Sequence, residues 1–133
     1  MYRPLPNQLT IRNSEIEGLG LFSEIKISKN SFIGITHIRN ESFPNSYIRT
    51  PLGGFYNHSK NPNIIKLGTD TLPGFEFGKT INSNLISSIN KKNQKKSNFL
   101  FLVSLKDINP GQELVAEYTF YQFWNNMNSS YEI

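Results

Sequence analysis

The chain has 133 residues, the length of one domain, and its 37% apolar residues include ten Phe, six Tyr and one Trp, which can supply a core. It has no Cys, which excludes disulfides, thiolate–zinc clusters and cysteine nucleophiles. Fourteen basic and ten acidic residues give a net charge of +4, but four of the lysines lie together at residues 91–96. The rest of the chain is therefore neutral, and its basic character is confined to one loop.

Short apolar or alternating runs predict a succession of short extended segments. In chain order they are residues 9–12, 31–38, 64–67, 74–80, 84–89, 99–105 and 114–118. The most apolar run, 99–105, is expected to be a buried central strand. A glycine turn at 17–23, a loop at 40–45 and a break at 50–54 separate the earlier segments, and residues 120–124 suit one helical turn. With no long helical period, we expect one mainly β domain over residues 1–133.

Two polar stretches about fifty residues apart stand out from this pattern. They are Gly54-Phe55-Tyr56-Asn57-His58-Ser59-Lys60-Asn61-Pro62-Asn63 and Asn109-Pro110-Gly111-Gln112-Glu113-Leu114-Val115-Ala116-Glu117-Tyr118. An Asn-His-Ser followed by Pro-Asn, and then a Pro-Gly-x-Glu-Leu turn before an acidic-Tyr pair, resemble the two-part signature of the SET domain. A third stretch, Gly18-Leu19-Gly20-Leu21-Phe22, is similar to the segment that opens this family.

The resemblance spans nearly the whole chain and implies a fold as well as an activity. The implied fold is a β-clip-like arrangement of small curled sheets with a knot-like C-terminal crossing. The implied activity is methyl transfer from S-adenosyl-L-methionine to a lysine amine in a protein substrate. Without Cys the chain resembles the minimal viral or bacterial type, which lacks pre- and post-SET zinc clusters. Residues 64–98 would be the insert that reads the target, and residues 119–133 would form an aromatic tail.

The same resemblance assigns cofactor binding to the glycine turn and the Asn-His pair. The candidates are Gly18, Leu19, Gly20, Asn57, His58 and, as a cover over the adenine, Trp124. Each has a simpler explanation: a hairpin turn, a structural histidine, or a ring in the core. A metal site is not expected, because the second histidine, His37, is not accompanied by a carboxylate cluster. A Ser-His-Asp hydrolase is not expected either, because no Ser lies in a nucleophile-elbow pattern.

Tyr118 is the predicted catalytic residue, since it occupies the family's position after the acidic residue. Methyl transfer needs a neutral amine, whereas free lysine titrates near ~10.4. An apolar tunnel beside a sulfonium disfavours the ammonium, and a tyrosine hydroxyl can orient the amine. Tyr56, Ala116 and Tyr121 are expected to line this tunnel. Ala116 stands where many relatives have Phe or Tyr, so we expect room for more than one methyl group.

Arg49 precedes the Asn-His pair by eight positions, and either a carboxylate-binding role or a plain surface position is consistent with the sequence. Phe123 and Trp124 of the tail are expected to cover the adenine or the lysine tunnel, with ordinary core packing as the alternative.

The expected function is that of a protein-lysine N-methyltransferase, and the alternative is a catalytically silent SET module that binds a peptide or partner protein. Nucleic-acid binding through residues 91–96 is disfavoured, because phosphate binding needs several distributed cations.

No apolar run approaches the roughly 20 residues of a membrane span and no secretory signal is evident, so we expect a cytoplasmic protein, in the host cytoplasm if viral. The identity of the substrate protein and a homodimer are left open.

Overall fold

The computed structural model describes residues 5–82 and 97–117, and all structural statements refer to these residues. They form eight strands and two short 3₁₀ turns. The strands are β1 (Leu9–Asn13), β2 (Leu19–Ser23), β3 (Phe32–Arg39), β4 (Tyr47–Arg49), β5 (Asn57–His58), β6 (Ile64–Thr69), β7 (Phe99–Ser104) and β8 (Val115–Ala116). The turns are η1 (Pro44–Ser46) and η2 (Pro51–Gly54). No helix in the described ranges is long and apolar enough to span a membrane.

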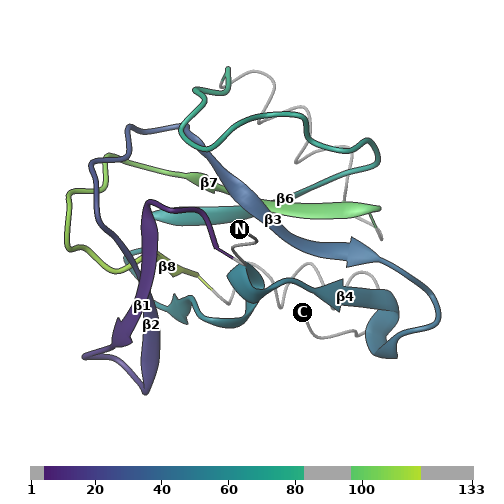
Figure 1. Cartoon of the computed structure of the whole chain (residues 1–133), viewed down its shortest axis with the longest axis horizontal. Helices are drawn as coiled ribbons and strands as arrows, with labels where there is room; N and C mark the ends of the chain where they lie inside the picture. The colour runs from purple at the N-terminus through teal and green to yellow at the C-terminus, as the bar shows by residue number, and fades with distance from the viewer. Residues whose placement is uncertain (1–4, 83–96, 118–133) are drawn as a thin grey trace.

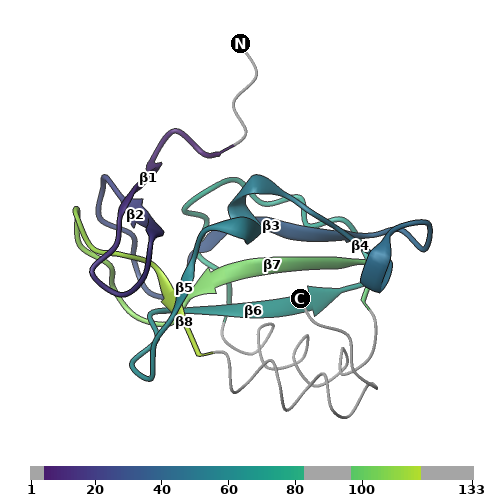
Figure 2. The same ribbon diagram turned by 90° about the horizontal axis from the view of Figure 1, so that it is seen from below.

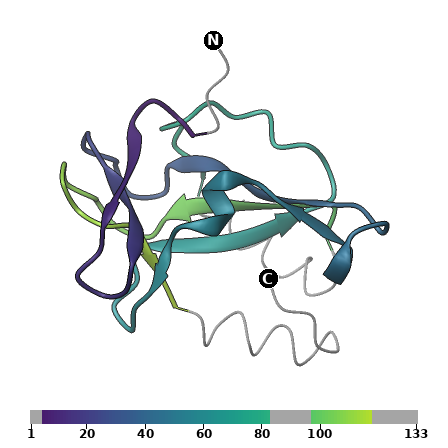
Figure 3. The same cartoon turned by 60° about the horizontal axis from the view of Figure 1, so that its bottom comes forward.

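The strands form three small sheets. β1 and β2 make an antiparallel hairpin, β4-β3-β7-β6 make an antiparallel sheet of four strands, and β5 pairs with β8 in parallel. The hairpin stands to one side of the four-stranded sheet (Figure 1). The β5–β8 pair lies between the hairpin and the sheet, as the two turned views show (Figures 2 and 3).

The core lies on both faces of the four-stranded sheet, because β7 alternates its side chains between them. Leu102 belongs to one buried cluster, together with Leu52, Tyr56 and Ala116. Phe101 and Val103 belong to the other, where the Phe101 ring lies 5.6 Å from that of Phe32. Burying side chains of this size contributes about 1.5–3 kcal/mol each. The prediction that residues 99–105 form a buried central strand is thus confirmed.

Two predicted segments differ from the structure. Residues 74–80 form no strand and contribute one isolated bridge, Ser31 to Thr80. The chain is interrupted there by Pro73, which has no amide hydrogen, and by Gly78, whose φ of +85° is incompatible with a ladder. The predicted glycine turn is also shorter than expected, because β2 already begins at Leu19. The predicted segments at 84–89 and 120–124 lie outside the described residues.

Candidate functional site

The parallel pairing of β5 with β8 brings the two polar motifs side by side. Asn57 pairs with Val115 and His58 pairs with Ala116. The ladder continues beyond the strands, since the Ser59 amide donates to the Ala116 carbonyl at 2.9 Å. Residues that are more than fifty positions apart in the sequence therefore share one short sheet.

Asn63 connects the second motif to the first through three of its four hydrogen bonds. Its side-chain Nδ2 donates to the Glu113 carbonyl at 2.9 Å, and its Oδ1 accepts from the Val115 amide at 2.9 Å. Its backbone amide donates to the Val115 carbonyl, and its carbonyl accepts from the Leu105 amide. Asn63 is 8% exposed, so these bonds are shielded from water. The sequence showed Asn63 only as part of a turn motif.

Glu113 joins the second motif to the hairpin and to Asn57. Its carboxylate accepts from Asn57 Nδ2 at 2.8 Å and from the Ser14 hydroxyl at 2.8 and 2.9 Å. Ser14 Oγ in turn accepts from the Ile16 amide at 2.9 Å, inside the turn between β1 and β2. Ser14 had no motif in the sequence, and no signal there would have connected it to Glu113.

The glycine segment lies directly against this carboxylate. A Cβ built on Gly20 would overlap the Glu113 carboxylate, so any other residue at this position would have to displace that carboxylate. Gly18 adopts a φ of +48°, and a Cβ there would meet no atom within 4 Å. The backbone beside Gly18 is therefore open, and Leu19 is half exposed.

Acceptor atoms gather around the Asn57 amide. Besides the Glu113 contact, Asn57 Nδ2 donates to the Glu17 and Leu19 carbonyls, each at 3.2 Å. The predicted residues Gly18, Leu19, Gly20 and Asn57 are thus brought together, with the oxygen atoms of the turn and of Glu113 among them. A surface with this many acceptors suits a ligand that carries hydrogen-bond donors or positive charge.

His58 lies next to Asn57 but directs its ring elsewhere. His58 Nε2 lies 3.5 Å from Glu117 Oε1, and the two side chains are 35% and 30% exposed. Because both side chains are partly solvated, this pair contributes little to the stability of the fold. The predicted tunnel residues Tyr56 and Ala116 are 7% and 0% exposed and belong to the same core cluster. Tyr118, Tyr121 and Trp124 lie outside the described residues.

A second cluster of polar side chains, which the sequence did not indicate, lies on the four-stranded sheet. Lys66 and His37 are 1% and 2% exposed, and Arg49 pairs with His37 across β3 and β4. Burial, and then the charge of Arg49, lower the pKa of Lys66 to about 7. Burial, followed by Lys66 and Arg49, lowers the pKa of His37 to about 2. Arg49 itself is exposed, as the surface alternative predicted. In the sequence, Lys66 was one residue of the predicted extended segment 64–67 and had no motif of its own.

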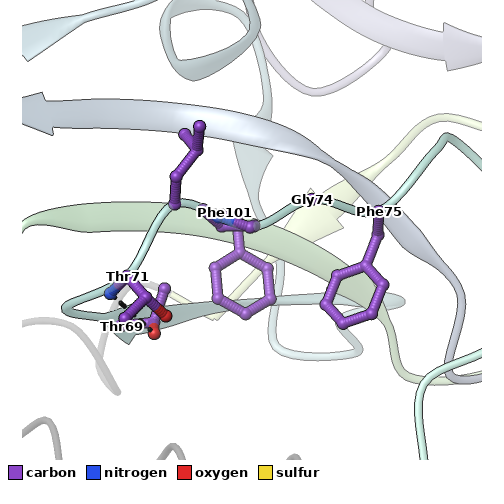
Figure 4. A pocket seen from close by; sticks show the side chains of 7 residues that line it. Thr69, Thr71, Gly74, Phe75 and Phe101 are labelled. Carbon is purple, nitrogen blue, oxygen red and sulfur yellow. Dashed lines mark hydrogen bonds between the residues drawn. The ribbon is translucent and has the colours of Figure 1, made fainter.

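Other features of the described residues do not join this site. A pocket of about 260 Å³ lies near the end of β6 and is lined mainly by Thr69, Thr71, Leu72, Phe75 and Phe101 (Figure 4). Phe101 and Phe75 contribute to the second core cluster, on the opposite face of the sheet from Leu102. Within residues 5–82 and 97–117, no group of three or more His, Asp or Glu residues could hold a metal ion.

Comparison with known proteins finds a likeness at the level of the structure. No protein-family model matches the sequence, and no curated protein matches it. The structure is similar to the crystal structure of a Plasmodium falciparum protein named a putative histone methyltransferase. The TM-score is 0.53 at 22% sequence identity, and the match covers 86% of this chain and 95% of that one.

The two chains share a fold. The predicted fold class, mainly β with small curled sheets in a SET-like arrangement, is confirmed by this match and by the observed strands. The knot-like crossing of the C-terminal segment stays a prediction, since residues 118–133 lie outside the described part.

Proposed function

We propose that this protein is a methyltransferase that transfers a methyl group from S-adenosyl-L-methionine to a lysine amine of a protein substrate. The observation that carries the proposal is the network in which the Glu113 carboxylate, close to β8, accepts hydrogen bonds from Asn57 and from Ser14 of the β1–β2 turn. The fold agrees, because a protein named a putative histone methyltransferase shares it. One polypeptide substrate bearing a target lysine is the partner that this reaction requires.

The residues around Asn57 suit the methionine end of this cofactor. Its ammonium group would meet the carbonyls of Glu17 and Leu19 beside the open backbone at Gly18. The cofactor-binding set that we propose consists of Gly18, Leu19, Gly20, Asn57, His58 and Trp124. When bound, S-adenosyl-L-methionine supplies an electrophilic methyl group on a cationic sulfonium.

Tyr118 would orient the acceptor amine for an in-line attack. In the sequence Tyr118 directly follows Glu117, the residue after β8, and β8 is the strand that pairs with Asn57 and His58. The acceptor amine must be neutral, and an apolar tunnel lined by Tyr56, Ala116 and Tyr121 would lower its pKa. Positioning would then supply most of the acceleration. Because Ala116 has only a methyl side chain, we propose that the tunnel admits amines that already carry methyl groups.

The reaction can be tested with labelled S-adenosyl-L-methionine in a cell lysate, comparing the native chain with Tyr118→Phe. We expect label on a discrete protein band, recovered as methyl-lysine and reduced at least about hundredfold in the variant. Cofactor binding without any label would favour the silent module that binds a peptide or partner. Neither binding nor label would contradict the proposal.

Several narrower expectations from the sequence remain predictions. They are the minimal viral or bacterial type, the cytoplasmic location, the target-reading role of residues 64–98, and an aromatic tail that covers the cofactor. The tail can be tested by deleting residues 120–133, which should abolish cofactor binding if Trp124 covers the adenine.

A further inference from the structure

The orientation of the Asn57 side chain is fixed by what surrounds it. Three acceptors lie around Nδ2: Glu113 Oε2 at 2.8 Å and the carbonyls of Glu17 and Leu19 at 3.2 Å each. A carboxylate and two carbonyls cannot donate hydrogen bonds, so the amide must turn its NH₂ group toward them. The opposite end of the amide, Oδ1, is therefore directed away from this group of acceptors.

Glu113 makes the shortest of these three contacts, and its own position is held on several sides. Ser14 donates its hydroxyl to the carboxylate at 2.8 Å. The backbone on either side is paired, because Asn63 Nδ2 donates to the Glu113 carbonyl and the Leu114 amide donates to the Leu21 carbonyl. A glutamate held in this way can impose its geometry on a neighbouring amide.

Gly20 supplies the space that the carboxylate needs. Any side chain there would overlap the Glu113 carboxylate, although Gly20 lies in the regular strand β2 opposite Arg12. Its φ is not positive, so backbone conformation does not require a glycine at this position. A larger residue at position 20 would therefore act on the position of the Glu113 carboxylate and not on the backbone conformation of β2.

We propose that Glu113 is a positioning residue that holds the Asn57 amide with its oxygen toward the ligand and gives the site its preference for an ammonium group. This inference rests on the proposed function, since it concerns the same site. The carbonyls of Glu17 and Leu19 each keep a lone pair for a further hydrogen bond. Together with Asn57 Oδ1 they offer acceptors only, and the nearby carboxylate adds negative charge.

The proposal predicts which part of a ligand depends on Glu113. S-adenosyl-L-methionine and S-adenosylhomocysteine both carry the ammonium group, whereas 5′-methylthioadenosine lacks the whole amino-acid end. In Glu113→Gln, the carboxylate is lost at nearly constant volume, and the new amide can face Asn57 with a donor. We expect the affinity for the two ammonium-bearing ligands to fall roughly tenfold or more and that for methylthioadenosine to stay within about twofold.

Calorimetric titration of the three ligands into the native chain and Glu113→Gln tests this pattern. Glu24→Gln is the matched control, since Glu24 pairs with the exposed Arg12 beside the same hairpin. An equal loss for all three ligands would mean that Glu113 is merely structural and would overturn the inference. Loss for S-adenosyl-L-methionine alone would also overturn it, because the charge would then act on the sulfonium. A native chain that binds none of the ligands would contradict the proposed function instead.

An exchange of the two side chains tests the contact between Asn57 and Glu113 directly. It does not require binding of 5′-methylthioadenosine to be measured. Asn57→Asp sets two carboxylates against each other and should abolish binding of S-adenosyl-L-methionine. Adding Glu113→Gln restores a donor opposite the new acceptor, so the double variant should recover at least about tenfold in affinity. No recovery would count against the positioning role.

Should Glu113→Gln fail to fold, Ser14→Ala provides a second test, because it removes a hydrogen bond to the same carboxylate. It should selectively weaken binding of the two ammonium-bearing ligands. An equal loss for all three ligands, or no loss, would overturn the inference.

Discussion

At the scale of single residues, the site depends on side chains that hold other groups in place. Asn63 and Glu113 together make bonds to β8, to Asn57 and to the β1–β2 turn. The resemblance to a known signature pointed to Asn57 and His58. It could not reveal Ser14, because the bond from Ser14 to Glu113 spans 99 positions and exists only once the hairpin packs against β8.

Asn63→Ala should destabilise the protein by about 2–4 kcal/mol, because it leaves the Glu113 carbonyl and the Val115 amide without their side-chain partner in a buried setting. Urea unfolding with an unchanged slope would measure the loss. The nearby exposed Asn61→Ala is the control and should change stability by less than about 0.5 kcal/mol. Equal stability of the two variants would show that the two side-chain hydrogen bonds of Asn63 do not hold the segment from Glu113 to Val115 in place.

At the scale of elements, apolar pattern predicted some strands well and others poorly. β7 was predictable because Phe99–Ser104 is an apolar run that is buried on both faces. The apolar pattern at 74–80 wrongly predicted a strand, because its aromatic rings pack on the core without the backbone joining a sheet. The Phe75 ring, for example, lies 5.7 Å from that of Phe32. The β5–β8 pair has two residues a strand, too short for any periodicity to predict.

The four-stranded sheet also contains Lys66, whose buried amine should make stability depend on pH. Its pKa is about 7 in the folded protein and 10.5 in the unfolded chain, with burial as the main cause. Between these values the unfolded chain binds more protons, so stability should rise with pH, by on the order of 5 kcal/mol in the limit. Below about pH 7 the folded protein carries the full cost of a buried ammonium.

Lys66→Met should therefore flatten the rise in stability between pH 7 and pH 10, with its largest gain over the native chain at pH 7. His37 does not interfere, because its pKa is lowered to about 2 and it stays neutral over this range. Urea unfolding at several pH values measures the effect, and the exposed Lys79→Met should follow the native curve. Parallel curves for the native chain and Lys66→Met would contradict the assignment of this slope to Lys66.

At the scale of the whole molecule, three segments far apart in sequence meet at one place. They are the β1–β2 hairpin, the segment from Asn57 to Asn63, and the segment from Glu113 to Glu117. The sequence predicted the fold class through the family resemblance, and the structure shows that the two motifs lie side by side. The sequence could not predict the contacts around Glu113, since only tertiary packing brings Gly20 next to that carboxylate.

The most direct test of the account is calorimetric binding of S-adenosyl-L-methionine to the native chain, Gly20→Ala and Gly54→Ala. A Cβ at position 20 would displace the Glu113 carboxylate, whereas at position 54 it would meet no atom within 4 Å. We predict binding by the native chain and by Gly54→Ala, and a loss of roughly tenfold or more in Gly20→Ala. No binding by the native chain, or equal binding by all three, would contradict a cofactor site built around Glu113 and Asn57.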